Sequence, residues 1–321
     1  MGNIQPSNAG HIPVLYHEVL AGLNPQPDQY FIDGTLGAGG HTRALATAIA
    51  PTGRLLAFDR DAEAVRFART QLQATSPDII DRITFVHDHY ATMAHHAAQH
   101  NFPPFHGIFL DLGLSSRQLD NPARGFSWRQ DGPLDMRFDT SQGPTAGDIV
   151  NNWSAEDLAD IFWRYADFAG SRRLARGLVA DRPFHSTNQL ADAIERHNSR
   201  GRHRQKQHPA SQIFQALRIA VNDELGRLEE TILTALDLLT PGGRLAIISF
   251  HSIEDRIVKL TFRRLSKACT CPPEQPICTC GGQPQAKLIT RKPISASPEE
   301  IETNPRSRSA HLRILAKEPT S

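Results

Sequence analysis

A glycine-rich turn, set between a short apolar run and a helical pattern, constrains this sequence more than any other feature. Tyr30 to Ile32 is predicted to form a strand that ends at Asp33, and Thr42 to Ala50 is predicted to form a helix. The segment Gly37–Gly40 lies between them. Glycine adopts a positive φ without steric penalty and lets a ligand come close to the backbone. A strand, a glycine turn and a helix N-terminus together predict a cradle for a nucleotide-like ligand.

Apolar runs that end in an aspartate recur after this turn. They are Arg54–Asp59, Ile83–Asp88 and Gly107–Asp111. Helical patterns such as Ala62 to Leu72 separate them, and this alternation predicts a parallel, doubly wound α/β sheet. Ligands of such sheets bind beyond the carboxyl ends of the strands. The acids expected to converge there are Asp33, Asp59, Asp88 and Asp111.

The spacing of the glycines indicates which ligand to expect. The turn reads Gly-Ala-Gly-Gly from Gly37 to Gly40, which differs from the Gly-x-Gly-x-x-Gly spacing of NAD enzymes. Asp33 can orient the turn or bind an amino group of the ligand, and Asp59 can hold ribose hydroxyls. The pattern therefore favours an amino-acid cofactor such as S-adenosylmethionine (SAM) over a dinucleotide. A tight turn without a ligand is the structural alternative.

The alternation of strands and helices stops after Leu119. From Asp120 to about His208 the recognisable patterns are helical, at Ala155–Tyr165, Ser171–Val179 and Asn188–His197. Ser154 is a predicted N-cap for the first of these helices. The sequence therefore predicts a mostly helical inserted domain, residues 120–210, within a discontinuous α/β core made of residues 1–119 and 211–321.

The second part of the core is expected to return to the sheet. A long helical stretch from Ser211 to Leu239, with a break near Gly226, is followed by a predicted turn at Thr240–Gly243. The predicted strands after it are Arg244–Phe250, Thr290–Ile294 and His311–Leu315.

Charge and hydropathy exclude some functions. The chain has 321 residues and a formal net charge of +1, so any nucleic-acid contact must come from local basic patches. Arg196–His208 is such a patch, with five Lys or Arg and no acid; phosphate contact and a solvated loop are its two interpretations. No apolar run is long enough to cross a membrane, and the polar N-terminus lacks a signal-peptide core. A cytoplasmic protein is expected.

The chain has four cysteines, close together near the C-terminus. They form two Cys-x-Cys pairs, Cys269 with Cys271 and Cys278 with Cys280. Four thiolates can bind a structural zinc ion tetrahedrally, although Cys-x-x-Cys is the commoner spacing. Free or redox-paired thiols are the alternative.

Two segments after strand ends are candidates for chemistry. Asp111 begins one of them, where a methyltransferase would bring its target atom to the cofactor. An exocyclic amine is a poor nucleophile that needs a hydrogen-bond acceptor and alignment, and Asp111 is a candidate acceptor or merely a cap of the following helix. In the other segment, His251 with Glu254 and Asp255 could assist proton removal, or serve as a helix cap with ion pairs.

Asn101–Phe105 resembles the Asn-Pro-Pro-aromatic motif of DNA amino-methylases, but it has an extra residue. It also precedes the Gly107–Asp111 strand, whereas that motif would follow it. Its prolines are better explained as the end of a helix.

Several segments together resemble the bacterial 16S rRNA (cytosine-N4)-methyltransferase family, the MraW family. The matching segments are His11–Leu15, Asp33–His41, Asp59–Asp61, Leu110–Ser116 with Gln118, Arg124–Ser127, Asp131–Arg137, Phe214–Leu225 and Gly242–Lys259. The resemblance implies a class I, Rossmann-like SAM-dependent methyltransferase core with a helical inserted domain for RNA recognition. It implies methylation of N4 of a cytidine in the decoding region of 16S ribosomal RNA.

The resemblance also implies which residues bind SAM. They are Gly39, Gly40, His41, Asp59, Tyr90, Asp111 and Gln118. Relatives can have Phe where this chain has Tyr90, and either ring can pack against an adenine. The implied partner is the small ribosomal subunit, and a homodimer is compatible with the sequence.

Three rival functions stay open at this point. One is an NAD-dependent oxidoreductase, a second is a methylase of another RNA or DNA amine, and a third is a non-catalytic RNA-binding assembly factor.

Overall fold

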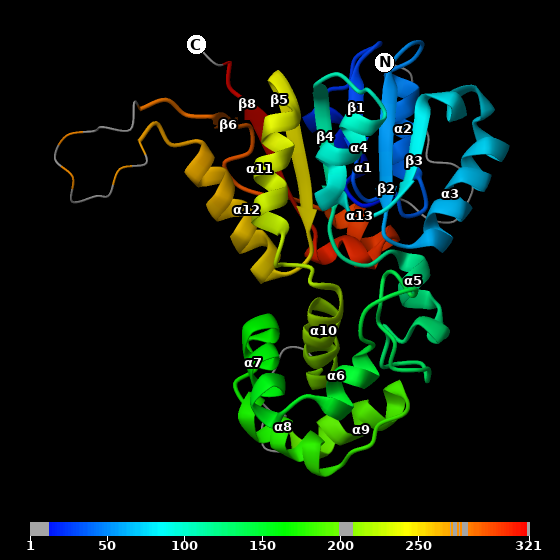
Figure 1. Cartoon of the computed structure of the whole chain (residues 1–321), viewed down its shortest axis with the longest axis vertical. Coiled ribbons are helices and arrows are strands. Elements are labelled where there is room, and N and C mark those ends of the chain that lie inside the picture. Colours follow the sequence, from blue (N-terminus) through cyan, green and yellow to red (C-terminus); the bar gives the residue numbers. More distant parts are fainter. Residues whose placement is uncertain are drawn as a thin grey trace. The chain divides into compact units, whose positions relative to one another are not determined.

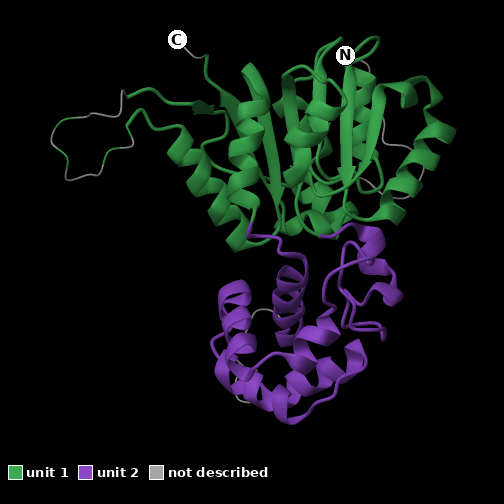
Figure 2. Cartoon of the chain, viewed as in Figure 1, with its two compact units in different colours: residues 1–113, 227–321 green, residues 114–226 purple. Residues whose placement is uncertain are grey.

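The structure, a computed structural model, divides into two compact units (Figure 2). It describes residues 13–198, 208–269, 271, 275, 277 and 282–319. Unit 1 consists of Met1–Gly113 with Arg227–Ser321, and unit 2 consists of Leu114–Gly226. Unit 2 extends beyond the expected insertion, residues 120–210, partly because helix α10 (Pro209–Asn222) packs against other helices of this unit.

Among the described residues, unit 1 is built on an eight-stranded sheet in the order β3-β2-β1-β4-β5-β8-β6, with β7 also paired to β8 (Figure 1). The strands are β1 Tyr30–Asp33, β2 Arg54–Asp59, β3 Ile83–His87, β4 Phe105–Asp111, β5 Leu239–Ser249, β6 Ala286–Leu288, β7 Ile294–Ser295 and β8 His311–Lys317. Strands β1 to β5 are parallel, whereas β8 runs antiparallel to β5.

Helices cover both faces of this sheet (Figure 1). The α-helices of unit 1 are α1 Tyr16–Leu23, α2 Gly40–Ala48, α3 Ala62–Thr75, α4 Met93–Gln99, α11 Leu228–Leu238, α12 Ser252–Leu265 and α13 Pro298–Thr303. Its short 3-10 helices are η1 Pro77–Arg82, η2 Tyr90–Thr92 and η4 Pro305–Ser309.

Neighbouring residues of each strand point to opposite faces, so the core has two layers. In β1, Phe31 packs with the apolar residues of α1, α2 and α3, whereas Ile32 packs with those of α4, α11 and α12. Strand β5 repeats the alternation, with Ala246 on the first side and Ile247 on the second. These layers and the strand order confirm the predicted α/β, Rossmann-like fold class.

Two predictions about the second part of the core are wrong. The segment Thr290–Ile294 was expected to be a strand, but only its last residue, Ile294, is in one, the two-residue strand β7, and β6 ends before the segment at Leu288. Thr290 Oγ1 accepts a hydrogen bond from the Ile314 amide at 2.8 Å, so a side chain takes the donor that a ladder carbonyl would need. Thr240–Gly243, expected as a turn, lies within β5, where the pairing with β4 changes register between Phe105 and Gly107.

Unit 2 is helical, and its described residues contain no strand. Its helices are α5 Ser116–Asp120, η3 Pro122–Arg124, α6 Ala146–Asn152, α7 Ala155–Ala166, α8 Ser171–Ala180, α9 Thr187–His197 and α10. The predicted helices at α7, α8 and α9 are confirmed, and Ser154 Oγ accepts the Asp157 amide at 3.0 Å as the expected N-cap. The predicted stretch from Ser211 to Leu239 is two helices, α10 and α11, interrupted around Gly226.

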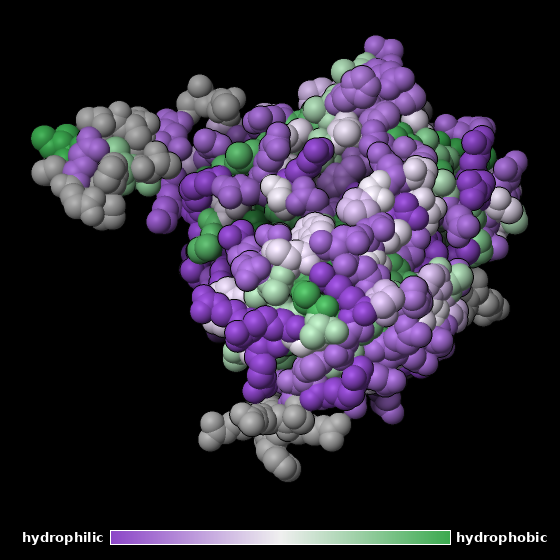
Figure 3. Space-filling view, turned by 60° about the horizontal axis from the view of Figure 1, so that its bottom comes forward, coloured by the Kyte–Doolittle hydropathy of each residue, from purple (hydrophilic) through white to green (hydrophobic). Residues whose placement is uncertain are grey.

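Figure 3 shows a mostly hydrophilic face on which apolar residues form small separate patches. In the part of the chain that the structure describes, every helix is too short or too polar to cross a bilayer.

Candidate functional site

The glycine turn, residues Asp33–His41, is held in shape by the acid at its start. Asp33 is fully buried; its Oδ1 accepts the Thr35 amide at 3.1 Å, and its Oδ2 accepts the Thr42 hydroxyl at 2.6 Å. Burial raises the pKa of Asp33 to about 6, although both threonines oppose the shift. Asp33 therefore orients the turn and the first turn of α2, which is one of the two roles expected of it.

The backbone of the turn requires glycine at two positions. Gly37 has a φ of 51° and Gly39, the N-cap of α2, has a φ of 84°, both in the left-handed region. A Cβ on Gly40 would overlap the ring of Pro13. The N-terminus of α2 thus begins directly behind a left-handed turn, an arrangement that suits an anionic or polar ligand group.

Asp59, at the end of β2, supports the same turn from the neighbouring strand. Its Oδ2 accepts the Gly37 amide and its Oδ1 accepts the Asp61 amide, each at 2.9 Å. Burial raises the pKa of Asp59 to about 6. An ionised carboxylate offers about four acceptor positions, so Asp59 can still bind ribose hydroxyls.

Asp111, at the end of β4, differs from the other two acids. Its amide donates to Thr35 Oγ1 at 2.7 Å, which ties it to the glycine turn. Its Oδ1 is buried and has no hydrogen-bond partner among the described residues. Burial, and then the nearby carboxylates of Asp33 and Glu254, raise the pKa of Asp111 to about 8. A buried acceptor left without a partner is rare in folded proteins and marks a candidate site for a ligand.

Asp88, the acid that follows β3, has both carboxylate oxygens in contact with neighbouring protein groups. Its Oδ1 accepts the His89 amide at 2.6 Å and its Oδ2 lies 3.0 Å from Nε2 of His96 on α4. These contacts fix the start of η2, whose first residue is Tyr90. Asp88 therefore positions the segment that carries Tyr90.

The aromatic residues assigned from the resemblance lie next to the turn. A Cβ on Gly34 would lie 3.0 Å from Cβ of Tyr90. The ring centroid of His41, on α2, lies 4.5 Å from that of Phe109 and 6.0 Å from that of Tyr16. The structure thus brings the unit 1 residues together around one turn: Gly39, Gly40, His41, Asp59, Tyr90 and Asp111.

Gln118 belongs to unit 2. Its Oε1 accepts the Ser115 amide at 3.1 Å, and Ser115 Oγ accepts the Gln118 amide at 3.3 Å. This capping box begins α5. Its assignment as a cofactor contact stays a prediction.

His251 and its neighbours cap a helix and form an ion pair. Nδ1 of His251, the N-cap of α12, accepts the Glu254 amide at 3.4 Å, while Glu254 Oε2 accepts the Phe250 amide at 2.9 Å. Asp255 binds Arg313 through two hydrogen bonds of 2.7 and 3.0 Å. Since these are the contacts of the structural alternative, the catalytic role of His251 stays a prediction.

The zinc prediction gains no support. Cys269 is exposed and Cys271 is half-buried, whereas Cys278 and Cys280 lie outside the described residues. Within the described ranges, no three His, Cys, Asp or Glu side chains are grouped so as to hold a metal ion.

The basic segment 196–208 is described only at its two ends, since residues 199–207 lie outside the described residues. His197 Nε2 lies 2.9 Å from Asp181, and His208 Nε2 lies 2.6 Å from Glu195. Both ends of the segment are thus paired with acids. Its contact with phosphates stays a prediction.

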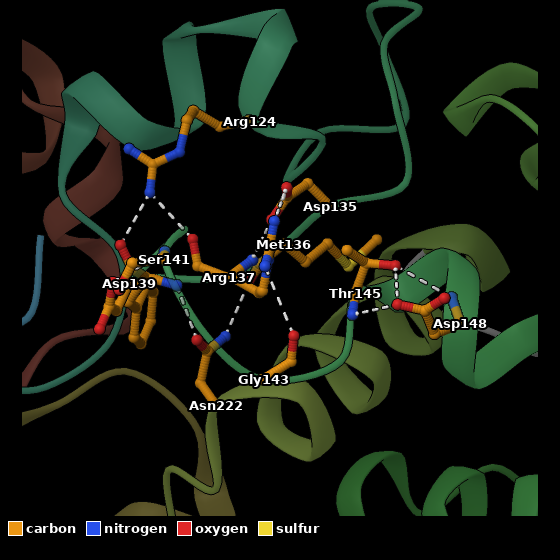
Figure 4. Close-up of polar contacts among 11 residues, drawn as sticks. Arg124, Asp135, Met136, Arg137, Asp139, Ser141, Gly143, Thr145, Asp148 and Asn222 are labelled. Carbon is orange, nitrogen blue, oxygen red and sulfur yellow. Dashed lines mark hydrogen bonds and ion pairs between the residues drawn. The ribbon is translucent and has the colours of Figure 1, made fainter.

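In unit 2, the arginine loop (residues Arg124–Asp148) is an ordered polar network (Figure 4). Arg137 forms a two-point ion pair with Asp135, at 3.0 and 2.8 Å. Arg124 Nη2 donates to the carbonyls of Arg137 and Phe138, each at 2.9 Å. These contacts hold the Asp131–Arg137 segment of the loop in a defined conformation.

Asn222, on α10, fastens the arginine loop from a distant part of the sequence. Its Oδ1 accepts the Phe138 amide and its Nδ2 donates to the Met136 carbonyl, both at 2.7 Å. Met136 is buried with a φ of 60°, a conformation that needs such support. The role of Asn222 was not predicted from the sequence, nor was the hydrogen bond that Thr35 accepts from the Asp111 amide. Only Thr35 had a recognisable signal, the Asp-x-Thr spacing from Asp33.

Comparison with known proteins gives matches over almost the whole chain. A family model described as the MraW methylase family matches residues 8–318. A protein of Thermomicrobium roseum named ribosomal RNA small subunit methyltransferase H is 47% identical over 97% of this chain and 95% of its own length. A protein of the same name from Citrifermentans bemidjiense is 46% identical over 96% of this chain and 98% of its own. Among solved structures, an rRNA methylase from Streptococcus thermophilus is 12% identical with a TM-score of 0.42, covering 96% and 99% of the two chains, a similarity that supports no further conclusion.

Proposed function

Since this chain belongs to the MraW methylase family, we propose that it transfers a methyl group from SAM to N4 of a cytidine in the decoding region of 16S ribosomal RNA. The names of the relatives support the RNA class, because both are ribosomal RNA small subunit methyltransferases. The sequence resemblance supports the choice of a cytidine N4 as the target atom.

The observation that carries the proposal is the unpartnered oxygen of Asp111 beside the glycine turn. SAM is a cation, and a positive charge next to this carboxyl lowers its pKa and favours the ionised form. The residues present fit the remaining groups of SAM as well. Asp59 has acceptor capacity for ribose hydroxyls, Tyr90 offers an aromatic face for adenine, and Gly37 leaves open space around the turn.

When bound, SAM supplies an electrophilic methyl group on a sulfonium. The residues of this chain then have to orient the amine of the base. The ionised Asp111 would accept a hydrogen bond from N4–H, which orients the nitrogen lone pair toward the methyl group. As N4 forms its bond to the methyl carbon and the bond from that carbon to sulfur breaks, the Asp111 carboxylate would take up the proton that N4 releases. Asp33 and Thr35 fix the position of Asp111 relative to the glycine turn. Asp33 accepts a hydrogen bond from the Thr35 amide, and the Thr35 hydroxyl oxygen accepts one from the Asp111 amide. A buried base can be reached only when it is unstacked from its RNA.

The test is methyl transfer with radiolabelled SAM to small ribosomal subunits that lack the modification, followed by digestion and mapping of the labelled nucleoside. We expect label in N4-methylcytidine at one position, and a loss of at least roughly 100-fold in rate for Asp111→Ala. Asp78→Asn, an exposed acid of unit 1, is the matched control and should keep full activity. Label at another atom or in another RNA, or full activity of Asp111→Ala, would contradict the proposal.

The same protein preparations separate the rival functions. Binding of NAD in preference to SAM would indicate an oxidoreductase. Tight RNA binding without methyl transfer, even with SAM present, would indicate an assembly factor.

A further inference from the structure

A hollow of about 1290 Å³ lies between α7 and α8 of unit 2, and an exposed tryptophan lines it. We call it the Trp163 groove; besides Trp163 its lining includes Gly170, Arg172, Arg173 and Arg176. The Trp163 side chain is 57% exposed, whereas tryptophan is usually largely buried.

Trp163 lies outside the hydrophobic core that the described residues of unit 2 form. The buried face of α7 is made by Leu158, Ile161 and Phe162, which belong to the core of unit 2. Trp163 follows Phe162 directly, so its Cβ points away from that face. An indole held on a regular helix at the wall of a groove is a preformed stacking surface.

The opposite wall supplies positive charge. Helix α8 buries Leu174 and Leu178, and its exposed side carries Arg172, Arg173 and Arg176 within one turn of each other. No ion pair of these three arginines occurs among the described residues. Arg176 Nε donates to the Arg172 carbonyl at 3.3 Å, which keeps this side chain along the helix.

Two further features of the groove bear on its charge. The N-cap of α8 is Gly170, which offers no side-chain acceptor, so the positive end of the helix dipole adds to the arginines. The acids of the lining are Glu156 and Asp160, and Asp160 is neutralised by Arg164 at 2.8 Å. Three arginines and a helix N-terminus therefore outweigh one remaining carboxylate.

We propose that the Trp163 groove binds an unpaired segment of the substrate RNA outside the methylated nucleotide. One base stacks on the Trp163 indole, and the adjoining phosphates bind Arg172, Arg173 and Arg176. Aromatic stacking next to arginines is how proteins hold single-stranded RNA, whereas an acidic peptide would use the charge and leave the indole without a partner. The identity of the ligand as RNA rests on the function proposed above.

The first experiment measures equilibrium binding of a fluorescein-labelled single-stranded oligoribonucleotide of mixed sequence to the full chain. Stacking of one base contributes about 1–3 kcal/mol, so Trp163→Ala should weaken binding by roughly 5- to 150-fold, and Trp163→Phe by less. The double variant Arg172→Gln with Arg176→Gln should weaken the salt dependence of binding. The negative slope of the logarithm of the association constant against the logarithm of the salt concentration should become less steep by roughly 1 to 2. Arg66→Gln with Arg69→Gln, which alters two exposed arginines of α3 in unit 1, removes the same charge elsewhere and should change neither quantity.

The second experiment separates this proposal from the proposed function. In the methyl transfer assay, Trp163→Ala should raise the KM for the small subunit several-fold while SAM affinity stays unchanged. Unchanged oligonucleotide binding in both groove variants, or equal affinity for duplex RNA, would overturn the groove even if the enzyme methylates 16S RNA. Binding that depends on Trp163, in a protein that methylates no ribosomal RNA, would support the groove and overturn the proposed function instead.

Discussion

The glycine turn of unit 1 and the arginine loop of unit 2 are both irregular segments rich in charge, but they treat that charge differently. In the arginine loop, Arg137 is matched by Asp135, and Arg124 by two main-chain carbonyls. At the glycine turn, Asp33, Asp59 and Asp111 lie near one another, and within the described part of the chain no basic side chain is bonded to them. Asp111 keeps a buried oxygen without a partner among these residues. The charged residues of the arginine loop are therefore bonded within the loop, whereas Asp111 at the glycine turn keeps an oxygen that can accept a hydrogen bond from a ligand.

The difference teaches how to tell a structural loop from a binding loop. Charges that are paired within a segment stabilise its conformation and leave little for a ligand. Carboxylates whose pKa is raised by burial and by each other are costly in the free protein, and a cationic ligand relieves that cost. On this view the charges of the arginine loop stabilise its conformation, whereas the acids of the glycine turn are candidates for binding a cationic ligand.

The largest expected effect comes from removing the support of the arginine loop. Asn222→Leu leaves the buried Phe138 amide and Met136 carbonyl without their partner, which should lower the free energy of unfolding of unit 2 by about 3 kcal/mol. All three tryptophans of the chain, Trp128, Trp153 and Trp163, lie in unit 2, so denaturant unfolding followed by tryptophan fluorescence reports on this unit.

Asn188→Leu, an exposed residue of α9, is the control for Asn222→Leu and should change stability by less than about 0.5 kcal/mol. SAM affinity should stay within about twofold for both variants. A large loss of SAM affinity in Asn222→Leu would show that the two segments are not separate in function.

A stability measurement on Asp111 tests the other half of the comparison. The pKa of Asp111 is about 8 in the folded protein and about 3.9 in an unfolded chain, so the folded form holds a proton that the unfolded form releases. Its contribution therefore lowers stability as the pH rises from about 4 to about 8. Asp111→Asn should raise the free energy of unfolding at pH 8 by an amount on the order of 2 kcal/mol, and much less at pH 5. Hydrogen exchange of β1 and β4 amides measures it; a variant less stable than the natural protein at pH 8 would refute the assignment.

The pH dependence of SAM binding sharpens the same point. A cation favours ionised Asp111, so the protein should release a proton on binding below pH 8, and affinity should rise between pH 6 and pH 8. In Asp111→Asn this part of the slope should vanish, with affinity at pH 8 lower by roughly tenfold. Calorimetry in buffers of different ionisation enthalpy counts the protons. Titration of SAM itself is common to both proteins, so equal slopes would count against Asp111.

The smallest expected effect concerns His251. Asn is also a good N-cap, so His251→Asn should leave the free energy of unfolding nearly unchanged and the rate of methyl transfer within about threefold. His251→Ala should lower the free energy of unfolding by about 1 kcal/mol. Thermal unfolding and the transfer assay measure both. A fall of 100-fold in His251→Asn, with normal stability, would instead assign His251 to proton transfer.

Much of unit 1 could be predicted from the sequence because its signals are local. Strands β1 to β4 are short apolar runs that end in an acid or, in β3, directly before one, and each has buried side chains on both faces. The same pattern predicted where Asp33, Asp59 and Asp111 lie, which is most of the candidate site. The strand prediction at Thr290 failed because of a contact with β8, 24 residues further on, where the Ile314 amide donates a hydrogen bond to Thr290 Oγ1.

The remaining features could not be predicted because they arise from contacts distant in sequence. The link between Asn222 and the arginine loop joins residues 84 and 86 positions apart, and neither end carries a recognisable motif. Trp163 lies in a helical pattern where an aromatic residue is normally read as core. Only the packing of α7 shows that Leu158, Ile161 and Phe162 already fill that face.

The placement of unit 2 between Gly113 and Arg227 also sets a timetable for synthesis. Strand β4 leaves the ribosome before unit 2, and its neighbour β5 leaves after it. At about 5–20 residues per second, more than about a hundred intervening residues take roughly 5 to 20 s or slightly longer. During that interval the edge of β4 that will pair with β5 has no partner strand. A nascent chain of this order therefore has to complete a helical unit while a sheet edge stays open, the stage at which a chaperone would be most useful.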